Sequence, residues 1–174
     1  GESGGEVCTY GFHEKRDVRV IVDSVRTGPV ILIGTSLGAA VGLQAAGKDP
    51  RIAGVIAVEV FSDLRTVALE RAPSLLPWWV IDQAFEIAES RGSFDLDQVS
   101  PRDSAARLTI PVLLIHGAED VDTPPSHSER VFSALRGPKR LMLVPGAGHN
   151  RSLNSSDTWL VIDEWIGAIT RERL

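Results

Sequence analysis

Short aliphatic runs alternate along the chain with segments whose apolar residues recur at helical spacing. The runs have the length and composition of buried strands, and they span residues 30–33, 52–58, 112–115 and 140–144. The helical pattern predicts helices over residues 14–26, 38–48, 62–71, 78–91, 102–107, 126–135 and 156–171. Strands that alternate with helices favour a parallel sheet covered on both faces. The predicted fold class is therefore α/β, with a parallel sheet of about four strands and helices on both faces.

The turn after the first aliphatic run reads Gly34-Thr35-Ser36-Leu37-Gly38 and leads into a helix of small residues. A strand, a sharp turn with a central serine and a helix are the context of a nucleophile elbow. We expect both glycines to keep side chains away where backbones pass closely. Ser36 is then the nucleophile, and the backbone N–H of Leu37, at a helix N-terminus, is the first donor of an oxyanion hole. The alternative is a helix start that Thr35 or Ser36 merely caps.

Two later loops follow strands at the same edge of the predicted sheet, where α/β proteins place their chemistry. His149 lies in the last of them, between glycine-rich residues, and is the best base to take the proton of Ser36. Asp120, in the loop after residue 115, is our first choice for the acid that orients His149. The chain order Ser, Asp, His is the order expected for a nucleophile elbow. The alternatives for the acid are Glu119, Asp122 and Glu59.

The other histidines receive different interpretations. His116 directly follows a buried strand, and we expect it to make a structural hydrogen bond. His127 lies on a helix whose other positions look solvated, and His13 lies in the N-terminal loop. Both are therefore expected to be surface residues without a catalytic role.

Aromatic residues gather between the second and third strands, and they are Trp78, Trp79 and Phe85. They could line a pocket for an acyl group. The alternative is that they pack against the core or cover it.

Composition excludes several classes of function. The chain has 174 residues, a net charge of −5 and no basic run, which argues against a nucleic-acid partner. No apolar stretch approaches the roughly 18–20 residues that span a bilayer, so no membrane partner is expected. Cys8 is the only cysteine, which excludes an intrachain disulfide. We find no metal-ligand spacing and no phosphate-binding glycine loop, and therefore predict no metal and no cofactor. A cytoplasmic location is predicted.

The sequence resembles the α/β-hydrolase superfamily, most closely its esterases, dienelactone-hydrolase-like proteins and serine-aminopeptidase-like hydrolases. Four stretches carry the resemblance over nearly the whole chain. They are the segment 1–17 with Thr9-Tyr10-Gly11 and Asp17, the elbow 34–38, the acid loop 115–124 and the histidine loop Pro145-Gly146-Ala147-Gly148-His149. The acid-loop pattern, His-Gly-x-x-Asp-x-x-Thr-Pro, implies that Asp120 is the triad acid.

The chain departs from the superfamily in one respect. Relatives carry about four more strands before this segment, and a loop after their third strand supplies the second oxyanion N–H. By resemblance, residues 1–174 are one domain that lacks its N-terminal strands, with a cap-like helical insertion at about 73–105. The strand at 30–33 would then have an unpaired apolar edge. We expect a second chain, or a missing N-terminal segment, to cover it.

Together these observations predict a serine hydrolase that cleaves carboxylic esters or related acyl bonds of small molecules through an acyl-enzyme. Two alternatives stay open. A fragment with impaired catalysis would act only through association, and a peptidase or thioesterase of the same fold would use the same residues on another acyl bond.

Overall fold

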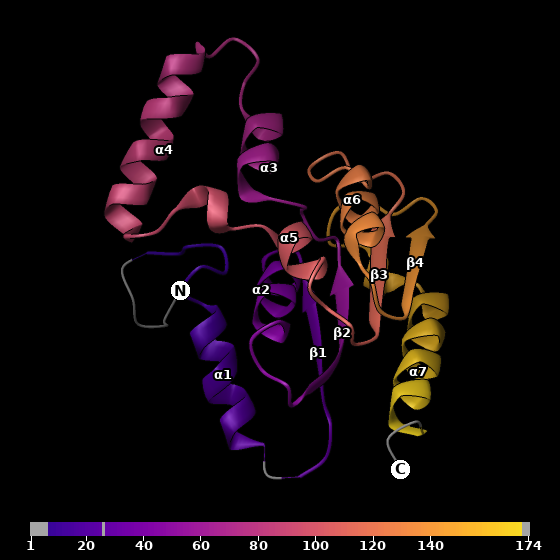
Figure 1. Cartoon of the computed structure of the whole chain (residues 1–174). Coiled ribbons are helices and arrows are strands. Elements are labelled where there is room, and N and C mark those ends of the chain that lie inside the picture. The colour runs from indigo at the N-terminus through magenta and orange to yellow at the C-terminus, as the bar shows by residue number, and fades with distance from the viewer. Residues whose placement is uncertain (1–6, 26, 172–174) are drawn as a thin grey trace.

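The computed structural model describes residues 7–25 and 27–171, and its centre is a four-stranded parallel sheet (Figure 1). Its strands are β1 (Val30–Thr35), β2 (Ile52–Val58), β3 (Val112–Gly117) and β4 (Lys139–Val144). They lie side by side in chain order, each parallel to the next. The predicted α/β class with four parallel strands is confirmed. Parallel strands bring their carboxyl ends to one edge, so the loops after β1, β3 and β4 meet there.

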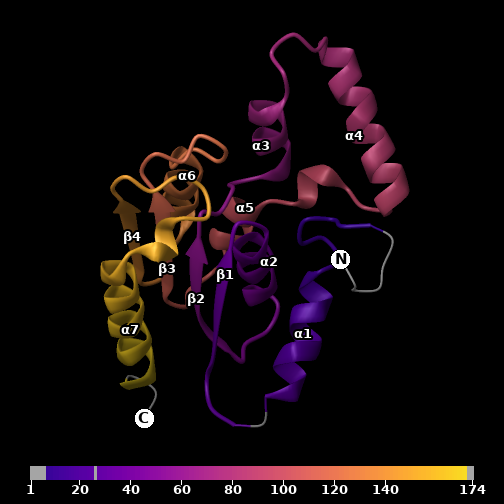
Figure 2. The same ribbon diagram turned by 180° about the vertical axis from the view of Figure 1, so that it is seen from behind.

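Helices cover both faces of the sheet because the central strands are apolar on both faces (Figures 1 and 2). In β2, Val55 and Ala57 belong to one core and Ile56 and Val58 to the other. The first core is shared with α1 (Lys15–Ser24), α2 (Leu37–Ala46), α5 (Pro101–Ala105) and α6 (Ser126–Ala134). The second core is closed by α7 (Ser156–Arg171), which follows the 3₁₀ turn η2 (Ser152–Asn154).

The helix α2 is the most deeply buried helix of the fold. Eight of its ten residues, from Ala39 to Ala46, are buried. Small side chains at Ala39, Ala40 and Gly42 let the helix backbone approach β1 and β2 closely. The start of α2, which follows the Gly-x-Ser-x-Gly turn, is thereby fixed against the sheet.

The segment between β2 and β3 divides into an outlying part and a core part. It contains α3 (Leu64–Arg71), α4 (Trp78–Gly92) and the 3₁₀ turn η1 (Leu96–Gln98). Both ribbon views show α4 standing apart from the sheet, and Gly92 is its only buried residue (Figures 1 and 2). By contrast, Phe94, Leu96 and Val99 pack in the core. Only the part of residues 73–105 up to α4 therefore has the position of a cap.

The two edge strands differ in character. In the part of the chain that the structure describes, β1 pairs only with β2, and its sequence carries no charged residue. Ile33 on this strand is 47% exposed. In contrast, β4 begins with the exposed Lys139 and Arg140, charges of the kind that protect an edge strand from further pairing.

The starts of α3 and α5 differ from the sequence expectation. The helix expected at 62–71 begins at Leu64, after the cap Asp63, whose carboxylate accepts the Thr66 N–H at 2.9 Å. The short helix expected at 102–107 begins instead at Pro101, after the cap Ser100. Arg26 and residues 1–5 of the resemblance lie outside the described residues. None of the helices that the structure describes is long and apolar enough to cross a bilayer.

Candidate active site

Ser36 occupies the turn between β1 and α2 in a backbone conformation that residues other than glycine rarely adopt. Its φ is 46° and its ψ is −110°, and its N–H donates to the Val58 carbonyl at 2.8 Å. A positive φ at a non-glycine residue is strained and is common at functional sites. Ser36 stands at the N-cap position of α2, but its side chain makes no capping hydrogen bond. This contradicts the alternative in which Ser36 caps the helix.

The tight turn requires one of its two glycines. A Cβ on Gly34 would lie 2.4 Å from the carbonyl carbon of Gly38, so no side chain fits at Gly34. A Cβ on Gly38 would meet nothing within 4 Å. The expected reason for glycine is therefore confirmed at Gly34 and wrong at Gly38.

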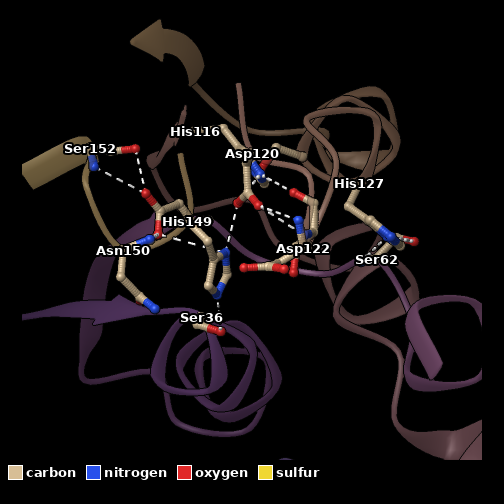
Figure 3. A network of polar contacts seen from close by, with 12 residues as sticks. Ser36, Ser62, His116, Asp120, Asp122, His127, His149, Asn150 and Ser152 are labelled. Carbon is tan, nitrogen blue, oxygen red and sulfur yellow. Dashed lines mark hydrogen bonds and ion pairs between the residues drawn. The ribbon is translucent and has the colours of Figure 1, made fainter. Parts of the chain in front are cut away.

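The structure brings Ser36, His149 and Asp120 together, although they come from three different loops (Figure 3). His149 Nε2 lies 3.2 Å from the Ser36 hydroxyl, and Nδ1 lies 2.7 Å from Asp120 Oδ2. The His149 side chain is 12% exposed, whereas the Asp120 carboxylate is fully buried. An imidazole between a hydroxyl and a carboxylate can take the serine proton while the carboxylate stabilises the imidazolium.

The acid loop fixes the orientation of the Asp120 carboxylate. Its Oδ1 accepts the backbone N–H of Asp122 at 3.0 Å and of Thr123 at 2.9 Å, which leaves Oδ2 toward His149. Asp122 thus contributes a backbone donor to this network. Glu119 is exposed, and its N–H donates to the Ala147 carbonyl at 3.0 Å. Of the acids considered from the sequence, the structure brings Asp120 nearest to His149.

Glu59 is a second buried carboxylate beside the histidine loop. It directly follows β2, has a φ of 54° and is fully buried. One of its oxygens accepts the Asn150 N–H, and the other accepts the N–H of Ser152 at 3.1 Å and its hydroxyl at 2.6 Å. Glu59 Oε2 is 3.9 Å from His149 Nδ1, farther than Asp120. Glu59 therefore holds the loop that carries His149. Sequence reasoning had considered it only as a partner of the imidazole.

Among the described side chains, Glu59, Asp120 and His149 lie close enough together to hold a metal ion. Ligand atoms of Glu59, Asp120 and His149 all lie within 4.8 Å of one another. Both Glu59 oxygens accept hydrogen bonds from the histidine loop, and Asp120 is engaged by its own loop and by His149. We therefore interpret the cluster as an acid–base network. The absence of a metal and a cofactor stays a prediction.

His116 makes the structural hydrogen bonds expected of it. It is fully buried, and its Nε2–H donates to the Thr123 carbonyl at 2.8 Å. Its Nδ1 accepts from the Ser128 hydroxyl at 2.6 Å. Nε2 also lies 3.3 Å from Asp120 Oδ2. His116 thus ties α6 to the acid loop.

The expectation that His127 is solvated is wrong. The residue is fully buried, and its ring lies between Ser62 and Glu70. The Ser62 N–H donates to Nδ1 at 3.1 Å, so the proton is on Nε2 and is donated to Glu70 at 2.7 Å. Burial lowers the pKa of His127, and the hydrogen bond to Glu70 offsets this only in part. The partners come from the loop after β2 and from α3, more than 50 residues away along the chain, which the pattern of α6 cannot indicate.

An apolar pocket of about 170 Å³ lies beside Ser36. Its lining residues come from the start of α2, from α3 with the loop before it, and from the loop before α1, and they are Tyr10, Ser36, Leu37, Phe61, Leu64, Val67, Ala68 and Arg71. The lining does not include the three aromatic residues singled out in the sequence. Trp78 and Trp79 are 75% and 56% exposed on the outlying α4, and Phe85 packs against the edge of the core. The aromatic residues between β2 and β3 therefore did not identify the pocket. One wall of the pocket is formed by α3, the first helix after β2.

A dedicated network holds the Tyr10 wall of this pocket. Tyr10 has a φ of 55°, and its carbonyl accepts from the Gln44 amide at 3.1 Å. The Glu14 carboxylate accepts the N–H of Thr9 at 2.6 Å and of Gly11 at 2.7 Å. Burial by itself would raise the pKa of Glu14, but these backbone donors outweigh it, so the pKa lies below its usual range. His13, next to this loop, is a surface neighbour of α4, with Nε2 3.2 Å from the Gly92 carbonyl.

Comparison with known proteins gives a family match over most of the chain. Residues 22–166 match the prolyl oligopeptidase family. The YqkD protein of Bacillus subtilis is 30% identical over 163 residues, which cover 87% of this chain and 53% of YqkD. The mouse mitochondrial palmitoyl-protein thioesterase ABHD10 is 26% identical over 180 residues, which cover 93% of this chain and 59% of that protein. The chain thus spans about half the length of the curated relatives it matches.

A solved structure extends this likeness to three dimensions. The structure of alpha/beta hydrolase domain-containing protein 10 from mouse superimposes with a TM-score of 0.68 and 25% identity. The match covers 97% of this chain and 74% of that one. The fold that the sequence resembles is therefore confirmed.

Proposed function

Because the chain belongs to the prolyl oligopeptidase family and has the α/β-hydrolase fold, we propose that it is a serine hydrolase that cleaves carboxylic esters or related acyl bonds. Ser36 is the proposed nucleophile, His149 the base and Asp120 the acid. The observation that carries this proposal is the His149 ring, 3.2 Å from the Ser36 hydroxyl and 2.7 Å from Asp120. The strained elbow and the adjoining pocket support it.

The reaction would proceed through an acyl-enzyme. The Ser36 oxygen attacks the substrate carbonyl while its proton moves to His149 Nε2. Asp120 fixes the tautomer with Nδ1–H and stabilises the imidazolium. The carbonyl oxygen becomes an oxyanion that accepts the Leu37 N–H at the start of α2, where the helix dipole is favourable. The leaving group takes the proton from His149, and a water molecule repeats the sequence to release the acid.

The type of acyl bond that the proposed hydrolase cleaves has two candidates besides simple esters. The likeness to a protein named as a palmitoyl-protein thioesterase supports thioesters. The family name supports peptide bonds as a second candidate. Alkyl esters, thioesters and amides of one acyl group separate these possibilities by their kcat/KM.

The outlying helix α4 is the proposed cap. It stands apart above the sheet edge at which Ser36 and His149 lie, and both its tryptophans are exposed (Figure 1). Replacing residues 74–91 with a flexible linker leaves the core residues from Phe94 onward in place. The cap proposal expects the preference for acyl size to change, and an unchanged preference would contradict it.

The edge of β1 is the proposed contact for a further chain segment. Its apolar sequence and the exposed Ile33 are the features of a strand that accepts another strand. We expect residues 1–174 on their own to associate, and Ile33→Lys to reduce the association seen by sedimentation velocity. A monodisperse, cooperatively folding monomer would count against this proposal.

The direct test of the hydrolase proposal compares the chain with Ser36→Ala in the hydrolysis of a short p-nitrophenyl ester. Loss of the nucleophile is expected to lower kcat/KM by about 10⁴-fold or more. Equal activity of the variant would reject Ser36 as the nucleophile. A folded chain without any activity would favour the alternative in which the protein acts only through association.

A further inference from the structure

The pocket beside Ser36 has apolar walls and a single cationic residue. Phe61, Leu64, Val67 and Ala68 form half of the lining, and Arg71 is its only charged member. We propose that this pocket selects short acyl groups that end in a carboxylate, and that Arg71 binds this carboxylate. The inference rests on the proposed function, because it names the acyl group that the same site accepts.

The structure holds the Arg71 guanidinium in place without neutralising it. Arg71 is the last residue of α3, and its Nε–H donates to the Asp122 carbonyl at 2.8 Å. Its Nη2 donates to the Thr123 hydroxyl at 2.5 Å. Both partners are uncharged, and a guanidinium has five N–H donors. The two bonds therefore fix the direction of the group and leave donors for a ligand.

Several of the described arginines have no carboxylate partner, and Arg71 is the one among them that lines the pocket beside Ser36. Arg65 on the same helix pairs with Asp97, and Arg130 pairs with Glu70. Arg51, Arg102 and Arg140 also have carboxylate partners. Within residues 7–25 and 27–171, no carboxylate lies within ion-pair distance of Arg71. A carboxylate on the ligand would supply the missing partner.

The position of Arg71 makes this charge available to a ligand. Arg71 is exposed, so a charge-assisted hydrogen bond from its guanidinium forms beside solvent and is partly screened. The guanidinium fork also matches the two oxygens of a carboxylate. An anionic acyl group near Ser36 meets the negative Asp120 and Asp122, so without Arg71 it would be repelled. Arg71 therefore decides whether such a group binds.

The size of the pocket limits the acyl chain. Sites for drug-sized ligands usually measure about 300–1,000 Å³, and this pocket measures about 170 Å³. A short dicarboxylic half-ester, such as a glutarate monoester, places the scissile carbonyl at Ser36 and the second carboxylate a few carbons away on the α3 wall.

The test uses two esters of matched shape, monomethyl glutarate and methyl 5-methylhexanoate, in which two methyl groups replace the carboxylate oxygens. Their affinities are first measured by NMR titration on Ser36→Ala, where no turnover is required. The same background then carries Arg71→Gln, which keeps hydrogen-bonding capacity without charge, or Arg71→Lys, which keeps the charge. Arg65→Gln is the matched control, because it removes a cation from the same helix outside the pocket.

We expect the anionic ester to bind more tightly than the neutral one, and Arg71→Gln to lower that preference about 10- to 100-fold. Arg71→Lys should retain part of the preference, and Arg65→Gln all of it. A preference for the neutral ester, or an equal loss of both affinities in Arg71→Gln, would overturn the proposal, since Arg71 would then only hold the acid loop. Hydrolysis by the chain with Ser36 intact is measured separately. If the binding preference is found without hydrolysis, the proposed function fails and this inference stands.

Discussion

Two of the serine–histidine–carboxylate arrangements in this fold, around His149 and around His127, resemble each other closely, and only the first has the surroundings of a catalytic site (Figure 3). In the first, His149 lies between Ser36 and Asp120 at 3.2 and 2.7 Å. In the second, His127 lies between Ser62 and Glu70 at 2.9 and 2.7 Å. The distances from ring to partners are almost the same, so contact alone does not distinguish the two.

The difference lies in the backbone and the access of each serine. Ser36 has a strained φ of 46° at the start of a buried helix and lines a pocket. Ser62 is fully buried, and its hydroxyl donates its single proton to the Asp63 carboxylate at 2.8 Å rather than to His127. The first hydroxyl lines a pocket and the second is buried, and the backbone N–H at the start of α2 is the proposed oxyanion donor beside the first. Access and the position of backbone donors, rather than the three residue types, therefore distinguish the proposed site.

The charged groups near the two histidines also differ. Arg130 Nη1 lies 3.2 Å from His127 Nδ1, and the ring is deeply buried. A neighbouring cation and burial both disfavour an imidazolium. His127 faces one carboxylate, that of Glu70, whereas His149 Nδ1 lies 2.7 Å from the Asp120 carboxylate and 3.9 Å from that of Glu59. His127 therefore suits a structural role that links α3 to α6.

The largest expected effect comes from neutralising the acid in each arrangement. Asp120→Asn should lower kcat/KM for ester hydrolysis by about 10⁴-fold, because the His149 tautomer is no longer fixed. Glu70→Gln should change it less than about threefold, because Glu70 supports only the buried His127. Steady-state kinetics on both variants, with folding checked by circular dichroism, make the comparison. Similar losses in the two variants would remove the distinction between the arrangements.

A smaller effect is expected from Glu59, which positions the His149 loop. Glu59→Gln replaces one accepting oxygen with an amide that faces N–H donors, so the loop that carries His149 loosens. We expect kcat to fall about 10- to 100-fold with little change in KM, since misplacement of a catalytic group by about 1 Å can cost that much. Glu59→Asp tests whether a shorter carboxylate rescues part of kcat. Unchanged kcat in a destabilised Glu59→Gln would limit Glu59 to a structural role.

The smallest effect concerns stability rather than catalysis. The folded pKa of His127 is lowered, so below about pH 6.5, the ordinary value for histidine, the unfolded chain binds a proton that the folded chain does not. The free energy of unfolding therefore falls as the pH drops from 7 toward 5.5. We expect His127→Gln to be about 1–3 kcal/mol less stable at pH 7, because buried hydrogen bonds are lost, and to show a flatter pH dependence. Urea denaturation at several pH values measures both, and an unchanged slope would contradict this role of His127.

The sequence was sufficient where local pattern and topology act together. Ser36, Asp120 and His149 each follow a strand, and parallel strands bring such loops to one edge, so their meeting could be expected before any coordinates. The glycine at position 34 is a further local signal of the elbow, because a Cβ there has no room.

The sequence was insufficient where a residue depends on a partner far along the chain. His127 looked solvated because its neighbours on α6 are polar, yet Ser62 and Glu70 bury it from another segment. From the sequence, Trp78 and Trp79 could either line a pocket or pack against the core, but both are exposed on α4 and do neither. The role of Glu59 depends on hydrogen bonds from Asn150 and Ser152, which lie more than 90 residues later in the chain. Such non-local contacts leave no period or spacing in the sequence.

The most direct test of the account is fluorophosphonate labelling of the folded chain followed by peptide mapping, with Ser36→Ala and Ser62→Ala as the matched pair. The account predicts that the label is found on Ser36, that it disappears in Ser36→Ala and that it persists in Ser62→Ala. Labelling that survives in Ser36→Ala, or a folded chain that is not labelled at all, would contradict the claim that the His149 arrangement is the active one.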